Sequence, residues 1–178
     1  KHIIDDLFLL TAKPMIYVCN VDEASILTGN EYVDKVKEAL KDQETEILVI
    51  AGATEADIAE LEDEEDRVEF LKDAGLKEPG VNKLVRSAYS LLNLETFFTV
   101  GPKEIRAWTV KKGSLAPQAA GTIHSDLERG FIRAEVMKFN DYVELGSENA
   151  VKDAGKFRVE GKNYMLADGD ILHIRFNV

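Results

Sequence analysis

The first half of the chain alternates short apolar runs with amphipathic stretches. The runs Met15–Cys19 and Glu46–Ile50 are mostly hydrophobic, a pattern typical of strands that are covered on both faces of a parallel sheet. Each run is followed by a predicted helix, over Glu31–Asp42 after the first strand and from about Thr54 after the second. Thr54 and Asp57 have the spacing of a helix N-cap and its N3 acid. The order strand, helix, strand, helix predicts an α/β unit.

Three further segments complete the predicted first half. Residues 3–10 have the pattern of the last turns of a helix that Pro14 ends, and Val81–Leu94 is a third amphipathic helix. The run Glu60–Asp66 holds six acids in seven residues. We interpret this run as a solvated helix face. A metal site is the alternative, but the run lacks the glycine with which a calcium loop turns.

After Glu95 the hydrophobic pattern changes to that of short strands. Strands are predicted over Ile105–Val110, Phe131–Phe139 and Ile171–Phe176, with a short helix over Ala116–His124. Alternation along the last strand predicts side chains on opposite faces, with Leu172, Ile174 and Phe176 inward and His173 and Arg175 outward. Two strands, a crossing helix and further strands are the order of a β-grasp, ubiquitin-like domain. The predicted fold class is therefore an α/β part followed by an α+β domain.

Composition narrows the class of protein. The chain has 178 residues, 45% of them hydrophobic, which is enough for a packed core. No apolar run approaches the roughly 20 residues of a membrane-spanning helix, so no membrane partner is expected. The chain begins without methionine, and Asp5 and Asp6 interrupt any signal-peptide pattern. We therefore expect a cytoplasmic chain cut from a longer protein. Cys19, the single cysteine, is expected in the core rather than as a redox-active thiol.

Charge is distributed unevenly along the chain, whose net charge is −11. Residues 1–95 carry 22 Asp or Glu against 10 Lys or Arg, whereas residues 96–178 carry 11 against 12. The acidic first part argues against nonspecific binding of polyanions, and no DNA partner is expected. The second part is nearly neutral, which leaves room for a local basic face.

The most informative motif, Asn20-Val21-Asp22-Glu23, follows the first predicted strand. Nucleotide domains of the GTPase type carry Asn-Lys-x-Asp at this point, and the Asp carboxylate accepts hydrogen bonds from the N1–H and the exocyclic amine of guanine. Here Val21 replaces the Lys that packs over the base, and Glu23 replaces the Asp. Because glutamate is one methylene longer, its bidentate match to guanine is displaced, and adenine is no longer excluded.

The second predicted strand ends on Ala51-Gly52-Ala53, which is placed to supply backbone N–H groups beside the base. Asn20 can orient the loop or bond the edge of the ring. By itself, Asn-x-x-Glu after a strand is also compatible with an ordinary turn or a helix cap. The interpretation as a base-binding motif therefore depends on the rest of the chain.

The second half interleaves basic residues with the only tryptophan. Arg106 and Trp108 share strand parity, a combination suited to the phosphates and bases of RNA. Trp108 on an alternating strand is usually a core residue, and the sharper alternative is a surface platform for a base. The candidate RNA- or ribosome-binding residues are Arg106, Trp108, Lys111, Lys112, Arg129, Arg133, Lys138 and Arg175. The alternative is a scatter of solubilising charge, balanced by the acids of the same half.

The histidines offer no catalytic or metal site. His124-Ser125-Asp126 contains the residue types of a catalytic triad, but consecutive side chains cannot stack as base, nucleophile and orienting group. A helix terminus at which Ser125 or Asp126 bonds nearby backbone is the better interpretation. His2 and His173 lack spaced partners for a metal. No catalytic residue and no metal ligand are therefore assigned.

Long blocks of the second half carry a family-specific pattern. The blocks are Phe97–Thr109, Ala116–Gly121, Ile123–Asp126, Gly130–Val136, Asp168–Asp170 and Arg175–Val178. They resemble the C-terminal TGS domain of the YchF / Obg-like ATPase family and cover nearly all of residues 96–178. The first half is similar to the same family in carrying Asn-x-x-Glu in place of Asn-Lys-x-Asp, on which the family's preference for ATP is thought to rest.

The resemblance implies a P-loop nucleotide domain, an inserted helical domain and a TGS domain. It assigns residues 1–10 to the end of the inserted domain, 11–95 to the C-terminal part of the nucleotide domain, and 96–178 to the ubiquitin-like β-grasp (TGS) domain. The fold class then becomes an α/β fragment, holding the last strands and helices of a P-loop domain, followed by the β-grasp. The positions carried over as base-binding are Asn20, Val21, Glu23, Ala51 and Gly52.

The resemblance also implies a ribosome-associated hydrolase of the translation-factor class that prefers ATP, with GTP as the alternative, and uses Mg²⁺. The large ribosomal subunit, rRNA or tRNA are the implied partners. The sequence contains no Gly-x-x-x-x-Gly-Lys-[Ser/Thr] motif, which would cradle phosphates and help hold magnesium. We therefore expect this chain alone to bind ATP weakly or not at all and to hydrolyse none. The alternative is a stand-alone RNA- or protein-binding TGS adaptor without nucleotide chemistry.

Overall fold

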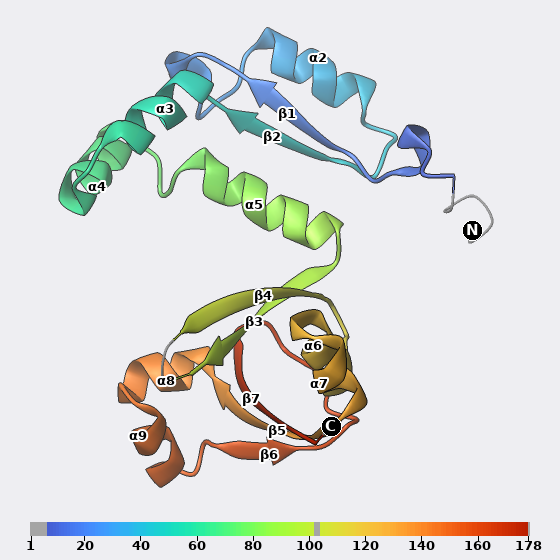
Figure 1. Ribbon diagram of the computed structural model, residues 1–178. Coiled ribbons are helices and arrows are strands. Elements are labelled where there is room, and N and C mark those ends of the chain that lie inside the picture. Colours follow the sequence, from blue (N-terminus) through green and yellow to red (C-terminus); the bar gives the residue numbers. More distant parts are fainter. Residues whose placement is uncertain (1–6, 102–103, 178) are drawn as a thin grey trace. The chain divides into compact units, whose positions relative to one another are not determined.

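The computed structural model describes residues 7–101 and 104–177, and the chain divides into two compact units, Lys1–Leu92 and Asn93–Val178 (Figure 1). Positions 3–6 of the first predicted helix lie outside the described residues, and residues 7 and 8 form a turn rather than a helix. The third predicted helix is three residues too long, because it ends at Leu91 and a strand begins at Leu94. The expected junction after Glu95 therefore falls inside that strand.

The first unit is a parallel pair of strands with helices between and after them. Its elements are η1 (Leu10–Ala12), β1 (Ile16–Asn20), η2 (Glu23–Ser25), α2 (Glu31–Ala39), β2 (Glu46–Ile50), α3 (Gly52–Glu60), α4 (Glu64–Asp73) and α5 (Gly80–Leu91). The pairing runs in register from Ile16 opposite Glu46 to Asn20 opposite Ile50. Both strands therefore end at the same edge, and the loops that follow them are neighbours. The predicted order of strands and helices is confirmed.

Two local predictions in the first unit are wrong. α3 begins at Gly52, so Thr54 is not its N-cap but a buried residue of its first turn. The run Glu60–Asp66 is not one helix face, because α3 ends at its first residue and α4 begins at its fifth. Leu61 is extended at this break, and its carbonyl accepts hydrogen bonds from the Arg67 guanidinium at 2.9 and 2.6 Å. The chain can turn here because the carbonyl that leaves the helix finds a new partner.

A carboxylate from α3 fixes the beginning of α5. Glu55 accepts hydrogen bonds from the backbone N–H groups of Gly80 at 2.6 Å and Val81 at 3.2 Å. The first N–H groups of a helix have no partner inside the helix, so this carboxylate acts as a cap supplied from another helix. A Cβ on Gly80 would lie 2.7 Å from Glu55 Oε1. The close approach of the carboxylate therefore requires glycine at this position.

The second unit is built on a five-stranded sheet of order β4-β3-β7-β5-β6. Its elements are β3 (Leu94–Val100), β4 (Ile105–Lys111), α6 (Ala116–Ile123), α7 (Ser125–Arg129), β5 (Phe131–Lys138), α8 (Phe139–Leu145), α9 (Glu148–Asp153), β6 (Arg158–Glu160) and β7 (Asp170–Phe176). β3 and β7 are parallel, and the other neighbours are antiparallel. The predicted strands and the predicted helix over α6 are confirmed, whereas β3, α7, α8, α9 and β6 were not predicted.

Helices cover both faces of this sheet (Figure 1). On the face covered by α6, the buried core residues are Phe97, Val110, Ala116, Ala119, Ala120, Phe131, Ala134, Val136, Leu166 and Leu172. On the opposite face, Met137 and Ile171 pack with Val151 of α9. The unit therefore has two apolar layers with the sheet between them.

The predicted alternation of the last strand, β7, is only partly right. Leu172 and Ile174 lie on the α6 side, as predicted. Phe176, the last residue of β7, is 47% exposed, and Ile171, at an outward position, is 2% exposed. The outward face is buried there because α8 and α9, which the alternation pattern did not reveal, pack against it.

A fully buried carboxylate closes the second unit beside β7. Asp170 accepts hydrogen bonds from Lys138 Nζ at 2.5 Å, the Tyr164 hydroxyl at 2.7 Å and the backbone N–H of Ala167 at 2.9 Å. Burial alone would lower the pKa of Lys138, but the bond to Asp170 and its charge outweigh burial, so this pKa is raised. The network joins β5, β7 and the segment that leads into β7.

Candidate functional site

Asn20 connects the two loops that follow β1 and β2. Its Oδ1 accepts a hydrogen bond from the backbone N–H of Gly52 at 2.9 Å, and the N–H of Val21 donates to the carbonyl of Ile50 at 2.9 Å. The predicted base-side residues Asn20, Val21, Ala51 and Gly52 are thus brought together where the paired strands end. Since Oδ1 is occupied, Asn20 positions the loops with that atom and retains its Nδ2 donor.

Gly52 lies where a larger residue would disturb this contact. A Cβ built on Gly52 would lie 3.2 Å from Asn20 Oδ1 and 3.7 Å from Asn20 Cγ. Ala51 is fully buried, so its side chain packs inside while the exposed backbone of Gly52 begins α3. The first N–H groups of this helix face the loop that carries Asn20, which is the backbone arrangement expected beside a base.

The remaining predicted residue, Glu23, begins the short helix η2. The neighbouring Asp22 caps this helix, because its Oδ1 accepts a hydrogen bond from the backbone N–H of Ser25 at 3.0 Å. Glu23 itself is exposed, and within residues 7–101 and 104–177 its carboxylate has no hydrogen bond or ion pair. Asp22, which sequence reasoning left without a role, therefore holds the turn, and Glu23 presents a free acceptor.

These positions carry groups that can pair with the edge of a nucleobase. The carboxylate of Glu23 can accept a hydrogen bond from an exocyclic amine, and Asn20 Nδ2 can donate to a ring nitrogen or carbonyl. The tetrapeptide is also a helix cap, so the two interpretations of the sequence motif coexist in one turn. The cap is made by Asp22 and leaves the other side chains available.

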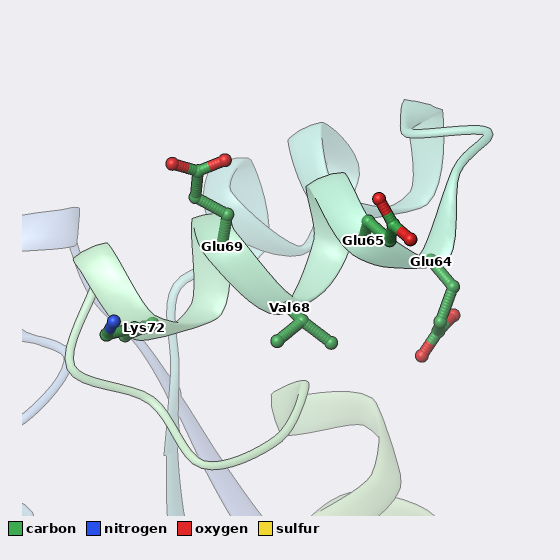
Figure 2. A pocket seen from close by; sticks show the side chains of 5 residues that line it. All are labelled: Glu64, Glu65, Val68, Glu69 and Lys72. Carbon is green, nitrogen blue, oxygen red and sulfur yellow. The ribbon is translucent and has the colours of Figure 1, made fainter.

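A separate hollow of about 410 Å³ lies along α4 (Figure 2). Its lining residues are Glu64, Glu65, Val68, Glu69 and Lys72. All five come from a single helix, and none of the predicted base-side residues is among them. We assign no chemistry to this hollow, because three carboxylates on a helix are typical of a solvated face.

The second unit has a groove of about 570 Å³ beside its α6-covered face. Its lining residues are Thr99, Val100, Gly101, Glu104, Arg106, Trp108, Ile123, His124, Leu127, Leu172, His173, Ile174 and Phe176. The Arg106 guanidinium lies 4.1 Å from the centre of the Trp108 ring, and Trp108 Nε1 donates a hydrogen bond to Thr99 Oγ1 at 2.9 Å. Trp108 also packs against the core, so both interpretations of this residue apply to it.

The structure does not gather the predicted basic residues on one face. Arg106 is on the groove side with Trp108, whereas Arg133 and Arg175 are cross-strand neighbours on the opposite side of the sheet. Strand alternation explains the split. Ala134 directly follows Arg133, and Leu172 lies three positions before Arg175. Both Ala134 and Leu172 belong to the core under α6, so the two arginines point to the other face. A single basic face built from all these residues is therefore wrong.

Most of the predicted basic residues are in ion pairs. The pairs are Arg175 with Glu135 at 2.9 Å, Lys138 with Asp170 at 2.5 Å, Lys112 with Glu95 and Arg106 with Glu104 at 3.9 Å each, and Arg129 with Asp126. The hydrogen bond from Arg175, assisted by its charge, lowers the pKa of Glu135. Of the candidate set, only Arg106 and Trp108 line the groove, which reduces the candidate RNA-facing residues to this pair and their neighbours.

The ring of His124 caps a helix. The sequence pattern predicted that Ser125 or Asp126 would make this contact with the backbone. Instead, His124 Nδ1 accepts a hydrogen bond from the backbone N–H of Asp126 at 3.1 Å, at the beginning of α7. In the part of the chain that the structure describes, no group of three His, Cys, Asp or Glu side chains is placed to hold a metal ion. No helix within those residues is long and apolar enough to cross a membrane.

The fold and these two sites define a mixed α/β protein. Its first unit carries a site in the loops after two parallel strands, and its second unit carries a groove beside a five-stranded sheet. A family model named YchF-GTPase_C, described as "Protein of unknown function (DUF933)", matches residues 94–177. "Ribosome-binding ATPase YchF" of Haemophilus ducreyi is 50% identical over 99% of this chain and 48% of its own length. "Obg-like ATPase 1" of Rattus norvegicus is 48% identical over 95% of this chain and 43% of its own.

A solved structure agrees with these relatives. The "Structure of the Schizosaccharomyces pombe YchF GTPase" matches 98% of this chain and 46% of that chain, with 36% identity and a TM-score of 0.84. The chain therefore belongs to the YchF / Obg-like ATPase family. It spans about half the length of the curated relatives it matches.

Proposed function

We propose that this chain supplies base recognition and partner docking to a ribosome-associated P-loop hydrolase that prefers ATP. The observation that carries the proposal is the hydrogen bond from Gly52 N to Asn20 Oδ1 at 2.9 Å, which holds two loops together beside the free carboxylate of Glu23. Relatives carry the names "Ribosome-binding ATPase YchF" and "Obg-like ATPase 1", and one solved structure is of a "YchF GTPase".

The choice between adenine and guanine depends on Glu23 and Val21. Guanine presents two adjacent donors that an aspartate at the position of Glu23 would accept together, and the longer glutamate displaces that match. A buried polar group that loses its partner costs about 1–3 kcal/mol. The amine of adenine donates to a single acceptor, and one oxygen of Glu23 provides it. Val21 offers an apolar contact where a lysine would pack over the ring.

Phosphate and magnesium contacts are not available from these 178 residues, which contain no P-loop motif. In the longer protein, ATP would supply the phosphoryl group that is transferred to water, Mg²⁺ would neutralise charge on the phosphates, and residues of the P-loop would hold them. This chain's own residues orient the base. We therefore propose residues 11–92 as the C-terminal part of the nucleotide domain, since the second unit begins at Asn93. We further propose residues 1–10 as the end of an inserted domain, and no hydrolysis by this chain alone.

The second unit is proposed as a TGS β-grasp that docks on the ribosome in the cytoplasm. Its strand order β4-β3-β7-β5-β6 corresponds to the order 2-1-5-3-4 in the unit's own numbering, with a parallel central pair and a helix across one face. This is the arrangement of a ubiquitin-like fold, which supports the β-grasp assignment, with the domain beginning at Asn93 rather than at residue 96. The proposed partners are the large ribosomal subunit, rRNA or tRNA.

Replacing Glu23 by aspartate in the full-length protein tests the base preference. We expect the ratio of GTP to ATP affinity to rise about tenfold, which corresponds to roughly 1.4 kcal/mol, or one matched hydrogen bond. Competition between the two nucleotides for a fluorescent analogue measures this ratio. Glu62→Asp makes the same chemical change at an exposed position of the α3–α4 loop and should leave the ratio unchanged. An unchanged ratio for Glu23→Asp would show that this side chain does not select the base.

The second candidate function is a TGS adaptor without nucleotide chemistry, favoured by the groove of the second unit. Isothermal titration with ATP and magnesium separates the two. We expect the full-length protein to bind ATP and this chain alone to bind it weakly or not at all. Micromolar binding by the chain alone would refute its dependence on a P-loop, and no binding by the full-length protein would favour the adaptor.

A further inference from the structure

The groove of the second unit has the size and lining of a site for one nucleotide. Its volume of about 570 Å³ lies within the range of small-ligand sites, about 300–1,000 Å³. A double helix cannot enter a space of this size, whereas a single unstacked base can. Ile123, Leu127 and Ile174 provide apolar lining, and Arg106 and His124 add hydrogen-bond donors.

Trp108 is held as a fixed flat surface in this groove. Its Nε1–H is satisfied by Thr99 Oγ1 at 2.9 Å, so the indole needs no further polar partner. Core residues pack against the side chain, and its cross-strand neighbour is the fully buried Phe97. A ring oriented in this way offers a stacking platform without loss of side-chain freedom on binding.

Arg106 covers the Trp108 ring but is not tightly held there. The guanidinium is 4.1 Å from the ring centre, and its ion pair with Glu104 is long, at 3.9 Å, with both side chains more than half exposed. Exposed ion pairs of this kind contribute little, and an exposed cation–π contact is weaker than the stacking of a base on an aromatic ring. A base can therefore take the place of the guanidinium, which is then free to bind the phosphate of the same nucleotide.

His124 contributes a hydrogen-bond donor at Nε2. Because Nδ1 accepts a hydrogen bond from the Asp126 N–H at 3.1 Å, the neutral ring carries its proton on Nε2. An Nε2–H donor suits a base carbonyl, a ring nitrogen or a phosphate oxygen. An apolar peptide side chain would use neither this donor nor Arg106, so the pattern of donors favours a nucleotide.

We propose that this groove binds one unstacked nucleotide of single-stranded RNA, with the base on Trp108, the phosphate at Arg106 and a hydrogen bond from His124. The proposal rests on the docking role proposed above for the second unit and gives it a ligand class. Single-stranded segments are where RNA exposes unstacked bases to aromatic and arginine side chains. The groove is distinct from the base-side loops of Asn20 and Glu23, which belong to the other unit.

The experiment uses the tryptophan itself, because Trp108 is the only one in the chain. The 178-residue chain is titrated with a single-stranded RNA octamer and with a duplex of the same sequence, at low and at physiological salt. We expect the single strand to quench the tryptophan fluorescence and to bind at least tenfold more tightly than the duplex. Arg106→Gln and His124→Gln should each weaken binding about 5- to 20-fold, and Arg106→Gln should also reduce its salt dependence.

Arg133→Gln is the matched control, since it makes the same chemical change on the opposite face of the same sheet, and its affinity should equal that of the unchanged protein. Trp108→Leu, checked for folding by circular dichroism and read with labelled RNA, should lose most of the binding. The absence of single-strand binding at low salt, equal affinity for the duplex, or an equal loss in Arg133→Gln would overturn the proposal.

Sedimentation of the full-length protein with ribosomes separates this inference from the proposed function. If sedimentation with ribosomes depends on the groove residues while no RNA octamer binds, the groove takes a protein partner. The RNA proposal is then overturned, although ribosome association stands. If the octamer binds as expected but the full-length protein does not sediment with ribosomes, the groove assignment stands and the ribosomal role fails.

Discussion

Replacing Asp170 by alanine should destabilise the second unit severely. Its carboxylate is 0% exposed and accepts three hydrogen bonds, from Lys138, Tyr164 and the N–H of Ala167. Removing one partner of a buried charged network costs about 3–5 kcal/mol, because the groups left behind lose their partners. Lys138 is 39% exposed and regains water, so we expect the lower part of that range.

Urea unfolding followed by tryptophan fluorescence measures this effect in the correct unit, because the only tryptophan belongs to it. With a slope of about 1.5 kcal/mol/M, a loss of about 3 kcal/mol lowers the midpoint by about 2 M. Asp170→Asn keeps the volume and one acceptor, and should lie between the alanine variant and the unchanged protein. Tyr164→Phe removes one donor and should lower the free energy of unfolding by about 1 kcal/mol.

Asp141→Asn is the matched control for charge removal. Asp141 pairs with Lys156 at 2.7 Å near the surface, where such a pair contributes about 0–1 kcal/mol. If Asp170→Ala lowered the midpoint no more than Asp141→Asn does, the buried carboxylate would not be the anchor described here. Additive effects of Asp170→Asn and Tyr164→Phe would likewise refute the network, since residues that share a hydrogen bond must couple.

Three further predictions concern other contacts. Gly52→Val places a side chain against the amide of Asn20 and should weaken ATP binding by the full-length protein at least tenfold with little change in circular dichroism; unaltered affinity would disprove the crowding. Glu55→Ala removes the cap of α5 and should cost about 1–2 kcal/mol, seen as faster hydrogen exchange at the beginning of α5, whereas equal exchange would contradict the cap. The pKa of Glu135 is lowered from 4.5 by its bond to Arg175. This bond therefore contributes stability above pH 4.5, and the contribution is lost as the pH falls through the lowered pKa. Arg175→Gln should remove that part of the acid-induced loss of stability, and an identical dependence of stability on pH in both proteins would argue against it.

The fold could be predicted where the hydrophobic pattern is local. The runs that became β1 and β2 and the alternation of β4 and β5 are visible in short windows, because a strand's pattern depends on which neighbouring positions are covered. The short helices α8 and α9 were missed because they are only a turn or two long, so their period is not expressed. Their presence also explains why Ile171, on the outward face of β7, is buried.

The candidate base site was more accessible to sequence reasoning than the groove. Asn20 and Gly52 could be paired in advance, because both follow strands that end at one edge of a parallel sheet. The helix caps made by Asp22 and by the ring of His124 could not be predicted. Each depends on the local direction of the backbone, which the residue type alone does not determine. The ion pairs of Arg175, Lys138 and Lys112 were equally hidden, because each of them joins residues far apart in the chain.

The sequence by itself determined the alternation of strands and helices in the first unit, the unusual Asn-x-x-Glu turn and the uneven charge, since these depend on residue type and short spacing. The tertiary structure alone decided that Asn20 holds Gly52 and that Trp108, Arg106 and His124 border one groove while Arg133 lies on the other face. Such convergence depends on strand order and register, which bring distant residues within hydrogen-bonding range and which local propensity does not specify.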